Sequence, residues 1–143
     1  MKKILFVCTG NTCRSPMAEN IFRAKARAAG RDDLEVASAG LMCYPGEDMS
    51  ENARLALTSL GVDAGQHRSR QFTLDMLDEY DLILTMTASH KAIIGASDKV
   101  FTLGEFAGGT DVADPYGGDV ETYKATASEL ADAIDRVIVK LTD

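Results

Sequence analysis

Short runs of apolar, β-favouring residues alternate along this chain with stretches of helical periodicity. Residues 4–7 form the first such run, Ile-Leu-Phe-Val, and an alanine-rich stretch over residues 17–29 follows it. An apolar run without polar alternation is typical of a strand that is buried on both faces. Because the runs are not joined by tight hairpin signals, the pattern predicts parallel strands connected by helices. We therefore expect an α/β fold with three layers, in which a small parallel sheet carries helices on both faces.

The expected elements can be placed along most of the chain. The first helix is expected to have Ser15 as its N-cap, Pro16 at its first position and Gly30 as its C-cap. In the helix over residues 51–60, Leu60 is expected on the buried apolar stripe. A long loop is expected over residues 108–118. Further strands are predicted at 34–37, 81–86 and 99–102, and further helices at 73–78, 89–94 and 120–141.

Size and charge limit the classes of function. The 143 residues suit one domain over residues 1–143. The 15 Lys and Arg against 22 Asp and Glu give the chain a net charge of −7. An acidic chain of this kind disfavours nucleic-acid binding, which needs a basic face. The apolar run at residues 4–7 is too short to cross a membrane or to act as an export signal, so we expect a cytoplasmic protein.

The three cysteines are expected as free thiols, because disulfide frameworks are rare in the cytoplasm. Cys8 and Cys13 are separated by four residues, unlike the close CxxC pairs of zinc ribbons, and the chain has two histidines. We therefore expect neither a metal nor any other cofactor. Cys43 has no evident partner in the sequence and is given no role.

The segment between the first strand and the first helix carries the chemistry, and it reads Cys-Thr-Gly-Asn-Thr-Cys-Arg-Ser-Pro over residues 8–16. Gly10 and Asn11 are residue types that tolerate left-handed backbone, so the loop can curl with its N–H groups pointing inward as an anion nest. The positive end of the following helix points to the same place. Arg14 adds a planar fork suited to phosphate. The sequence predicts a phosphate-binding loop directly after the first strand.

Cys8 stands where that strand ends, at the edge of the sheet where ligands bind in parallel α/β folds. An isolated cysteine is more often a buried structural thiol. Here five residues separate it from Arg14 at a strand-to-helix switch, and in such a positive field it is expected to ionise to the thiolate. The Gly-Lys-Ser/Thr of a Walker loop is absent. These features predict that Cys8 is a nucleophile that attacks phosphorus.

A leaving group on phosphorus also needs a proton, and Asp114 is the candidate donor. It forms the Asp-Pro step of Ala-Asp-Pro-Tyr at residues 113–116. The following proline restricts the backbone and can hold the carboxylate over a pocket. Taken alone, an Asp-Pro step indicates a turn. Its catalytic interpretation depends on the loop at residues 8–16.

Together these two motifs resemble those of the low-molecular-weight protein-tyrosine phosphatases, and the resemblance covers essentially the whole chain. Within that family, residues 8–16 and the Asp-Pro-Tyr-Gly-Gly at 114–118 are most similar to the bacterial protein-arginine phosphatases. Tyrosine-specific members usually carry an apolar residue such as Ile where this chain has Thr12. They also often have a second aromatic residue in place of Gly117.

The resemblance implies a mechanism that agrees with the interpretation of the residues. Cys8 would form a phosphocysteine intermediate, and Asp114 would protonate the leaving atom and then act as base on water. Ser15 would hydrogen-bond to the Cys8 sulfur, and Asn11 would hold the shape of the loop. His67 matches a family histidine that supports Asn11, although a surface histidine with another partner fits the sequence equally well.

The substrate is expected to contact the loop and the segment around Asp114. Thr12 can offer a hydroxyl acceptor to the N–H groups of phosphoarginine, or it can simply pack or cap the loop. Cys13 is either a small filler or a resolving thiol that captures oxidised Cys8 as a disulfide, which would make the enzyme redox-sensitive. The expected substrate-binding residues are Thr9, Gly10, Asn11, Thr12, Cys13, Ser15 and Tyr116.

The resemblance implies a hydrolase that removes phosphate from protein side chains, with phosphoarginine favoured. A protein-tyrosine phosphatase with the same machinery is the alternative. An arsenate reductase has little support, because it would need further cysteines after Cys43 and the chain has none. A phosphocysteine carrier would not need both Arg14 and Asp114, so their presence favours hydrolysis. An inert anion-binding module also stays open. We expect a monomer whose partners are phosphorylated proteins, with phosphate or related oxyanions binding the loop and no nucleic acid or membrane as partner.

Overall fold

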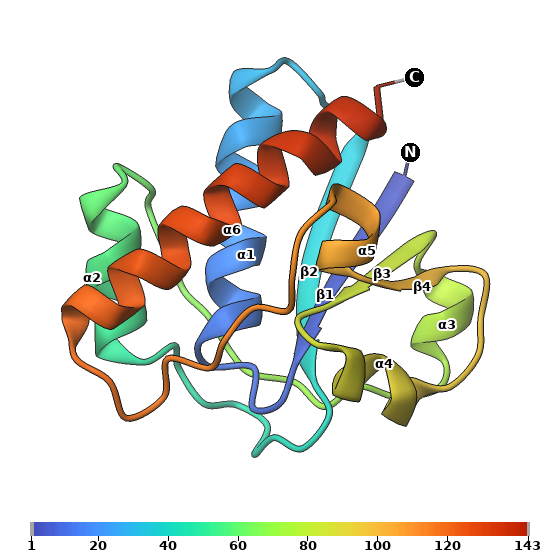
Figure 1. The fold of residues 1–143 in the computed structure, drawn as a ribbon, viewed down its shortest axis with the longest axis horizontal. Coiled ribbons are helices and arrows are strands. Elements are labelled where there is room, and N and C mark those ends of the chain that lie inside the picture. Colours follow the sequence, from blue (N-terminus) through green and yellow to red (C-terminus); the bar gives the residue numbers. More distant parts are fainter. Residues whose placement is uncertain (1, 143) are drawn as a thin grey trace.

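The computed structural model describes residues 2–142 and contains a four-stranded sheet in the order β2-β1-β3-β4 (Figure 1). All neighbouring strands are parallel, as predicted. The sheet therefore has one carboxyl edge, at which the loops that follow its strands converge. The strands are β1 (Lys2–Cys8), β2 (Leu34–Gly40), β3 (Leu82–Thr85) and β4 (Val100–Thr102).

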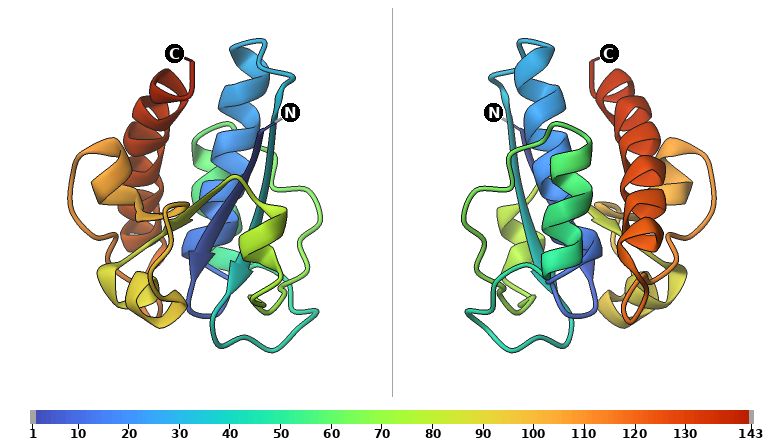
Figure 2. Two further views of the ribbon diagram at one scale, coloured as in Figure 1. Left: turned by 90° about the vertical axis from the view of Figure 1, so that its right-hand side faces the viewer. Right: turned by 90° about the vertical axis from the view of Figure 1, so that its left-hand side faces the viewer.

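Helices cover both faces of the sheet, which confirms the predicted three-layer α/β fold (Figure 2). On one face, α1 and α6 pack against each other, and α2 lies against both of them. On the opposite face lie α3 and the apolar end of α4. The helices are α1 (Arg14–Ala28), α2 (Glu51–Ser59), α3 (Met76–Glu79), α4 (Ala88–Ile94), α5 (Leu103–Ala107) and α6 (Val120–Lys140).

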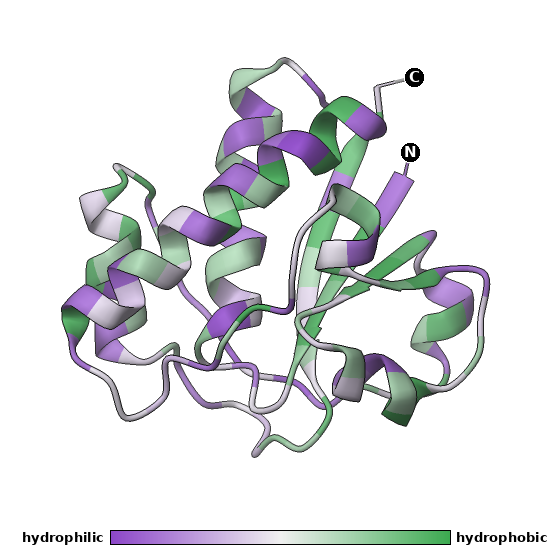
Figure 3. Ribbon diagram, in the orientation of Figure 1, coloured by the Kyte–Doolittle hydropathy of each residue, from purple (hydrophilic) through white to green (hydrophobic). Residues whose placement is uncertain are grey.

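The central strand β1 explains why its sequence is apolar throughout. Ile4 and Phe6 belong to the core beneath α1 and α6, whereas Leu5 and Val7 belong to the core on the opposite face. All four are completely buried. Burying a side chain of this size contributes roughly 1.5–3 kcal/mol. Figure 3 shows strands that are largely hydrophobic and helices that are banded in both colours.

The start of α1 differs from the prediction. The N-cap is Cys13, and its side chain makes no capping hydrogen bond. Ser15 is instead the second residue of the helix. Its hydroxyl contacts the side chains of Asn11 and Cys8 rather than capping the helix. Pro16 occupies the third position, still within the first turn, where a missing N–H costs nothing. The C-cap is Ala29 rather than the predicted Gly30, which follows it with a φ of 70°, in the left-handed position where glycine is common after a helix.

Three further details differ from the sequence expectations. The helix α5 was not predicted, although Thr102 and Glu105 form a complete capping box at its start. Leu60 is 40% exposed, because α2 ends at Ser59 and Leu60 leaves the buried stripe. The short helix α3 begins at Met76 rather than at residue 73.

The long C-terminal helix lies within one residue of its predicted limits. Asp119 caps α6 by accepting a hydrogen bond from the backbone N–H of Thr122. Among residues 2–142, no helix has both the length and the apolar composition that spanning a bilayer requires.

Candidate active site

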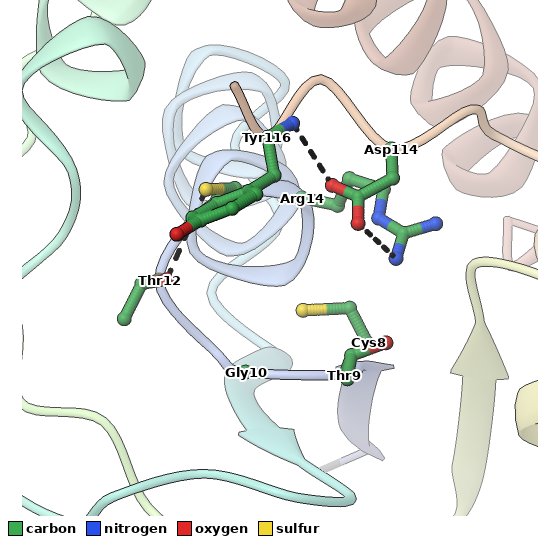
Figure 4. A pocket seen from close by; sticks show the side chains of 8 residues that line it. Cys8, Thr9, Gly10, Thr12, Arg14, Asp114 and Tyr116 are labelled. Atoms are coloured by element: carbon green, nitrogen blue, oxygen red, sulfur yellow. Dashed lines mark hydrogen bonds and ion pairs between the residues drawn. The ribbon is translucent and has the colours of Figure 1, made fainter. Parts of the chain in front are cut away.

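The residues predicted from the two ends of the sequence line one cavity at the carboxyl end of β1. Its volume is about 260 Å³. The loop between β1 and α1 forms its floor, and the segment between α5 and α6 forms its opposite wall (Figure 4). Its lining comprises Cys8, Thr9, Gly10, Thr12, Cys13, Arg14, Asp114 and Tyr116.

Cys8 lies at the bottom of this cavity as the last residue of β1, and it is 3% exposed. Its Sγ is 2.9 Å from the Oγ of Ser15. Because that Oγ accepts a hydrogen bond from Asn11 Nδ2 at 2.9 Å, the Ser15 proton can be donated either to the sulfur or to the carbonyl oxygen of Ala39, which lies 3.5 Å away. The predicted contact between Ser15 and Cys8 is therefore present in the structure.

Asn11 is the left-handed residue on which the loop turns, with a φ of 58° and no exposed surface. Its Nδ2 donates to Ser15 and to Ser38, each at 2.9 Å. Its Oδ1 accepts from the backbone N–H of Arg70 at 3.0 Å, and its carbonyl oxygen lies 2.7 Å from Nε2 of His67. Four contacts hold one strained residue, and the expected contact of His67 with Asn11 is among them.

Glycine serves a different purpose here than the sequence suggested. Gly10 is not left-handed, and a Cβ added there would meet the Thr12 hydroxyl at an ordinary 3.7 Å. Gly40, at the end of β2, is the glycine that the loop requires. A Cβ at Gly40 would lie 2.7 Å from the carbonyl oxygen of Thr9 and 3.0 Å from the backbone nitrogen of Asn11. Any larger residue would push the loop off the sheet.

Arg14 connects the loop to the opposite wall. It is buried, and its Nη1 donates to the carbonyl oxygen of Val112 at 2.9 Å. Its Nη2 lies 3.7 Å from Oδ2 of Asp114 (Figure 4). The guanidinium is therefore fixed by the segment that also carries the carboxylate, and both groups border the cavity that contains Cys8.

Asp114 itself is held loosely. Its side chain is 53% exposed, and its Oδ1 accepts a hydrogen bond from the backbone N–H of Tyr116 at 3.1 Å. Tyr116 is 82% exposed and stands at the rim of the cavity (Figure 4). Because Asp114 is half exposed, its ion pair with Arg14 contributes little to stability.

Thr12 and Cys13 lie side by side at the other end of the cavity. The Thr12 hydroxyl is 3.8 Å from Cys13 Sγ, a weak contact that leaves its lone pairs free. Cys13 is buried, and its Sγ lies 3.3 Å from the hydroxyl of Tyr123 and donates to Ser50 Oγ at 3.6 Å. Burial, and then the hydrogen bond with Cys13, raise the pKa of Tyr123 to about 12.

Several residues that shape the site were not identified from the sequence. Ser38 and Gly40 support the loop from β2, Arg70 binds Asn11, and Tyr123 lies behind Cys13. They lie far from residues 8–16 in the sequence, and no spacing rule connects them to the loop. The parallel register that pairs Cys8 with Gly40 would have indicated Gly40 once β2 was extended to its full length.

Comparison with known proteins agrees with this geometry. Residues 3–143 match the family model described as "Low molecular weight phosphotyrosine protein phosphatase". The chain is 43% identical to a protein-arginine-phosphatase of Geobacillus stearothermophilus, over 97% of this chain and 95% of that protein. It is 38% identical to the low molecular weight protein-tyrosine-phosphatase PtpB of Staphylococcus epidermidis, over 96% and 98% of the two chains.

Solved structures extend the agreement to the fold. A low molecular weight protein tyrosine phosphatase from T. tengcongensis superposes with a TM-score of 0.93 at 45% identity, covering 98% of this chain and 99% of that one. The YwlE arginine phosphatase from Geobacillus stearothermophilus gives 0.91 at 42% identity, covering 99% and 94%. The resemblance seen in the sequence is confirmed: this chain belongs to the low molecular weight phosphotyrosine protein phosphatase family.

Proposed function

We propose that this protein is a cysteine-dependent protein phosphatase that hydrolyses phosphoarginine in proteins. The observation that carries the proposal is the single cavity that contains Cys8, Arg14, Asp114 and the free hydroxyl of Thr12. A nucleophile, an anion-binding fork and a proton donor are what displacement at phosphorus requires. Relatives named as protein-arginine phosphatases support the choice of substrate.

In the first step, the Cys8 thiolate attacks phosphorus while the N–H groups of the loop and Arg14 hold the phosphoryl oxygens. The bond between phosphorus and the guanidinium nitrogen breaks as the bond to sulfur forms. Asp114 donates its proton to the departing nitrogen, so that arginine leaves as its guanidinium cation. The product on the enzyme is phosphocysteine.

In the second step, Asp114 is a carboxylate and accepts a proton from the attacking water. Oxygen bonds to phosphorus, the bond to sulfur breaks, and phosphate is released. The Ser15 hydroxyl, 2.9 Å from the Cys8 sulfur, would stabilise the thiolate as it leaves.

Thr12 is the residue proposed to select the substrate. A guanidinium group is rich in N–H donors and needs an acceptor on the wall of the cavity. The Thr12 hydroxyl has no strong partner among residues 2–142 and borders the cavity. An apolar side chain there would leave a substrate N–H unpaired, at a cost of roughly 1–3 kcal/mol.

Phosphotyrosine is the second candidate substrate. Tyr116 presents an aromatic ring at the rim, where the ring of a phosphotyrosine side chain could pack against it. Relatives named as protein-tyrosine phosphatases favour this alternative. A carrier that passes phosphate to a partner has less support, because such a carrier does not need an acidic residue like Asp114 in the cavity that contains Cys8.

The proposal includes the setting of the reaction. The substrates are phosphorylated proteins, and free phosphate or a related oxyanion would occupy the loop as product or inhibitor. We propose that the protein is a monomer and that it is cytoplasmic. The three free thiols support the cytoplasmic location.

Hydrolysis rates on three peptides that differ only in the phosphorylated residue test the function. We expect kcat/KM to be highest for phosphoarginine and lower for phosphotyrosine. Phosphoserine should react slowest, because its short side chain cannot bring phosphorus down to the buried Cys8. Faster turnover of phosphotyrosine would establish the alternative, and no turnover of any peptide would reject the phosphatase.

A further inference from the structure

A histidine that the mechanism above does not use contacts the phosphate-binding loop at Thr9. His90 lies in α4, at the same end of the sheet as the loop that follows β1 (Figure 1). Its Nε2 is 2.9 Å from Oγ1 of Thr9, and its side chain is buried although Thr9 itself is exposed. Its Nδ1 is, in the part of the chain that the structure describes, the one buried side-chain nitrogen or oxygen without a hydrogen-bond partner. Within residues 2–142, the contact with Thr9 is therefore the only hydrogen bond of the imidazole.

The segment that carries His90 also touches the wall with Asp114. The backbone N–H of Ala88 donates to Oδ2 of Asp111 at 3.1 Å. The N–H of Val112 donates to the carbonyl oxygen of Met86 at 2.9 Å, and Val112 in turn accepts from Arg14. Residues 86–90 thus contact both sides of the cavity.

The surroundings of His90, and burial above all, favour a neutral imidazole. Burial lowers its pKa, and the positive charge of Arg14 lowers it further. Asp114 and Asp111, from the segment between α5 and α6, act in the opposite direction. A neutral imidazole has one N–H donor and one acceptor nitrogen, either of which can pair with a hydroxyl.

Thr9 is a sensitive position because it directly follows the nucleophile. Its carbonyl oxygen accepts from the backbone N–H of Met42 at 2.9 Å, and its hydroxyl meets His90. These two contacts hold the residue from both sides. The N–H groups of such a loop bind an anion only while they converge, so a small rotation at Thr9 would weaken the grip on phosphate.

We propose that His90 is a positioning residue of this active site, which holds Thr9 so that the loop N–H groups after Cys8 face the phosphoryl oxygens. The inference rests on the proposed phosphatase function. Fold stability alone does not call for a histidine here, because an apolar side chain of similar size would fill the space without leaving a nitrogen unpaired.

Three substitutions separate this role from simple packing. His90→Phe removes the hydrogen bond, Thr9→Val removes it from the other side, and His90→Gln places an amide nitrogen near the position of Nε2. Loss of one neutral hydrogen bond predicts a fall in kcat/KM of about 3–10-fold for His90→Phe and for Thr9→Val. Competitive inhibition by inorganic phosphate should weaken by a similar factor, and His90→Gln should restore both values to within about twofold. The double variant His90→Phe/Thr9→Val should be no worse than either single one.

Ser89→Ala is the matched control, since Ser89 is an exposed neighbour on the same helix and should leave kcat/KM and stability unchanged. Thermal unfolding of each variant shows whether a loss of activity is a loss of folding. If His90→Phe does not fold, Thr9→Val still tests the inference, because it removes the same hydrogen bond from the other side. Wild-type activity in His90→Phe would overturn the inference, as would losses that multiply in the double variant. A wild-type protein that hydrolyses no phosphopeptide would reject the proposed function instead; calorimetric binding of phosphate would then still test His90.

Discussion

Residues 8–15 and residues 108–118 face each other across the cavity, and the two segments are held in different ways. In the first, Asn11 and Ser15 have no exposed surface, and the side chain of Asn11 donates hydrogen bonds to both Ser15 and Ser38. In the second, the half-exposed Asp114 has one backbone hydrogen bond and a 3.7 Å ion pair with Arg14. One side of the site is held by a network of buried hydrogen bonds, and the other side is open to solvent.

This difference separates two tasks. Phosphoryl transfer depends on donors that are already in place when charge develops, and in the proposed mechanism the buried segment supplies them. The leaving group differs between substrates, and in that mechanism it meets the open segment, where Asp114 and Tyr116 line the cavity. Substitutions of Cys8, Asn11 or Ser15 should therefore affect every substrate. Those at the open side, or at Thr12 on the cavity wall, should affect substrates unequally.

The largest effect is expected for Cys8→Ser, which should abolish turnover of all substrates. A serine hydroxyl is a far weaker nucleophile than a thiolate, while the loop N–H groups and Arg14 remain to bind phosphate. Steady-state rates and calorimetric titration with phosphate measure the two properties separately. Cys43→Ser is the control, because Cys43 does not line the cavity and its loss should leave turnover intact. Substantial activity in Cys8→Ser would contradict the mechanism.

Asp114→Asn should slow hydrolysis by about 10²–10⁴-fold, the usual contribution of a proton donor. The loss should shrink for aryl phosphates whose leaving groups are stable without a proton. Comparing leaving groups of different basicity checks this, because the better ones need Asp114 less. An equal loss across the series would show that Asp114 serves another purpose, such as holding Arg14 in place.

Thr12→Ile should change the preference between substrates by about 10–100-fold, the equivalent of one hydrogen bond to a cationic group at about 1.5–3 kcal/mol. Phosphoarginine turnover should fall, and phosphotyrosine turnover should hold or rise. Thr12→Ser keeps the hydroxyl and should keep the preference for phosphoarginine. An unchanged ratio of kcat/KM in Thr12→Ile would place specificity elsewhere and favour the tyrosine phosphatase.

The smallest effect concerns recovery from oxidation. Peroxide can convert the Cys8 thiolate to a sulfenic acid, which condenses with a neighbouring thiol to a disulfide and releases water. If Cys13 is that thiol, wild-type activity should return fully with a thiol reductant, and Cys13→Ser should recover less. Equal recovery of the two proteins would leave Cys13 as the buried partner of Tyr123 and Ser50.

Much of the architecture could be predicted from the sequence, because strands buried on both faces are apolar throughout and helices are periodic. The loop at residues 8–16 and the position of Asp114 were also within reach, since each motif is continuous in the sequence. Placing both motifs on one cavity required the fold. Ser15 was assigned to a helix cap because a serine before a proline suits that position, yet its hydroxyl is used by Cys8 and Asn11.

The supporting residues were not predictable for a physical reason. Gly40 matters because the loop packs onto its Cα, and Tyr123 and His90 matter because distant elements place them behind the loop. Such contacts depend on strand register and helix packing, which local patterns do not determine. The helix α5 is different, because its capping box of Thr102 and Glu105 is a local pattern from which the helix could have been predicted.

The covalent intermediate is the most direct test of the central claim, that Cys8 carries the phosphoryl group during turnover. Mixing the enzyme with excess phosphoarginine peptide and quenching within one turnover should trap a protein that is heavier by one phosphoryl group. Peptide mass spectrometry should place that group on Cys8, and Asp114→Asn should accumulate more of it if its base role in the second step limits release. Turnover without a phosphorylated Cys8, or a phosphoryl group on another residue, would contradict the account.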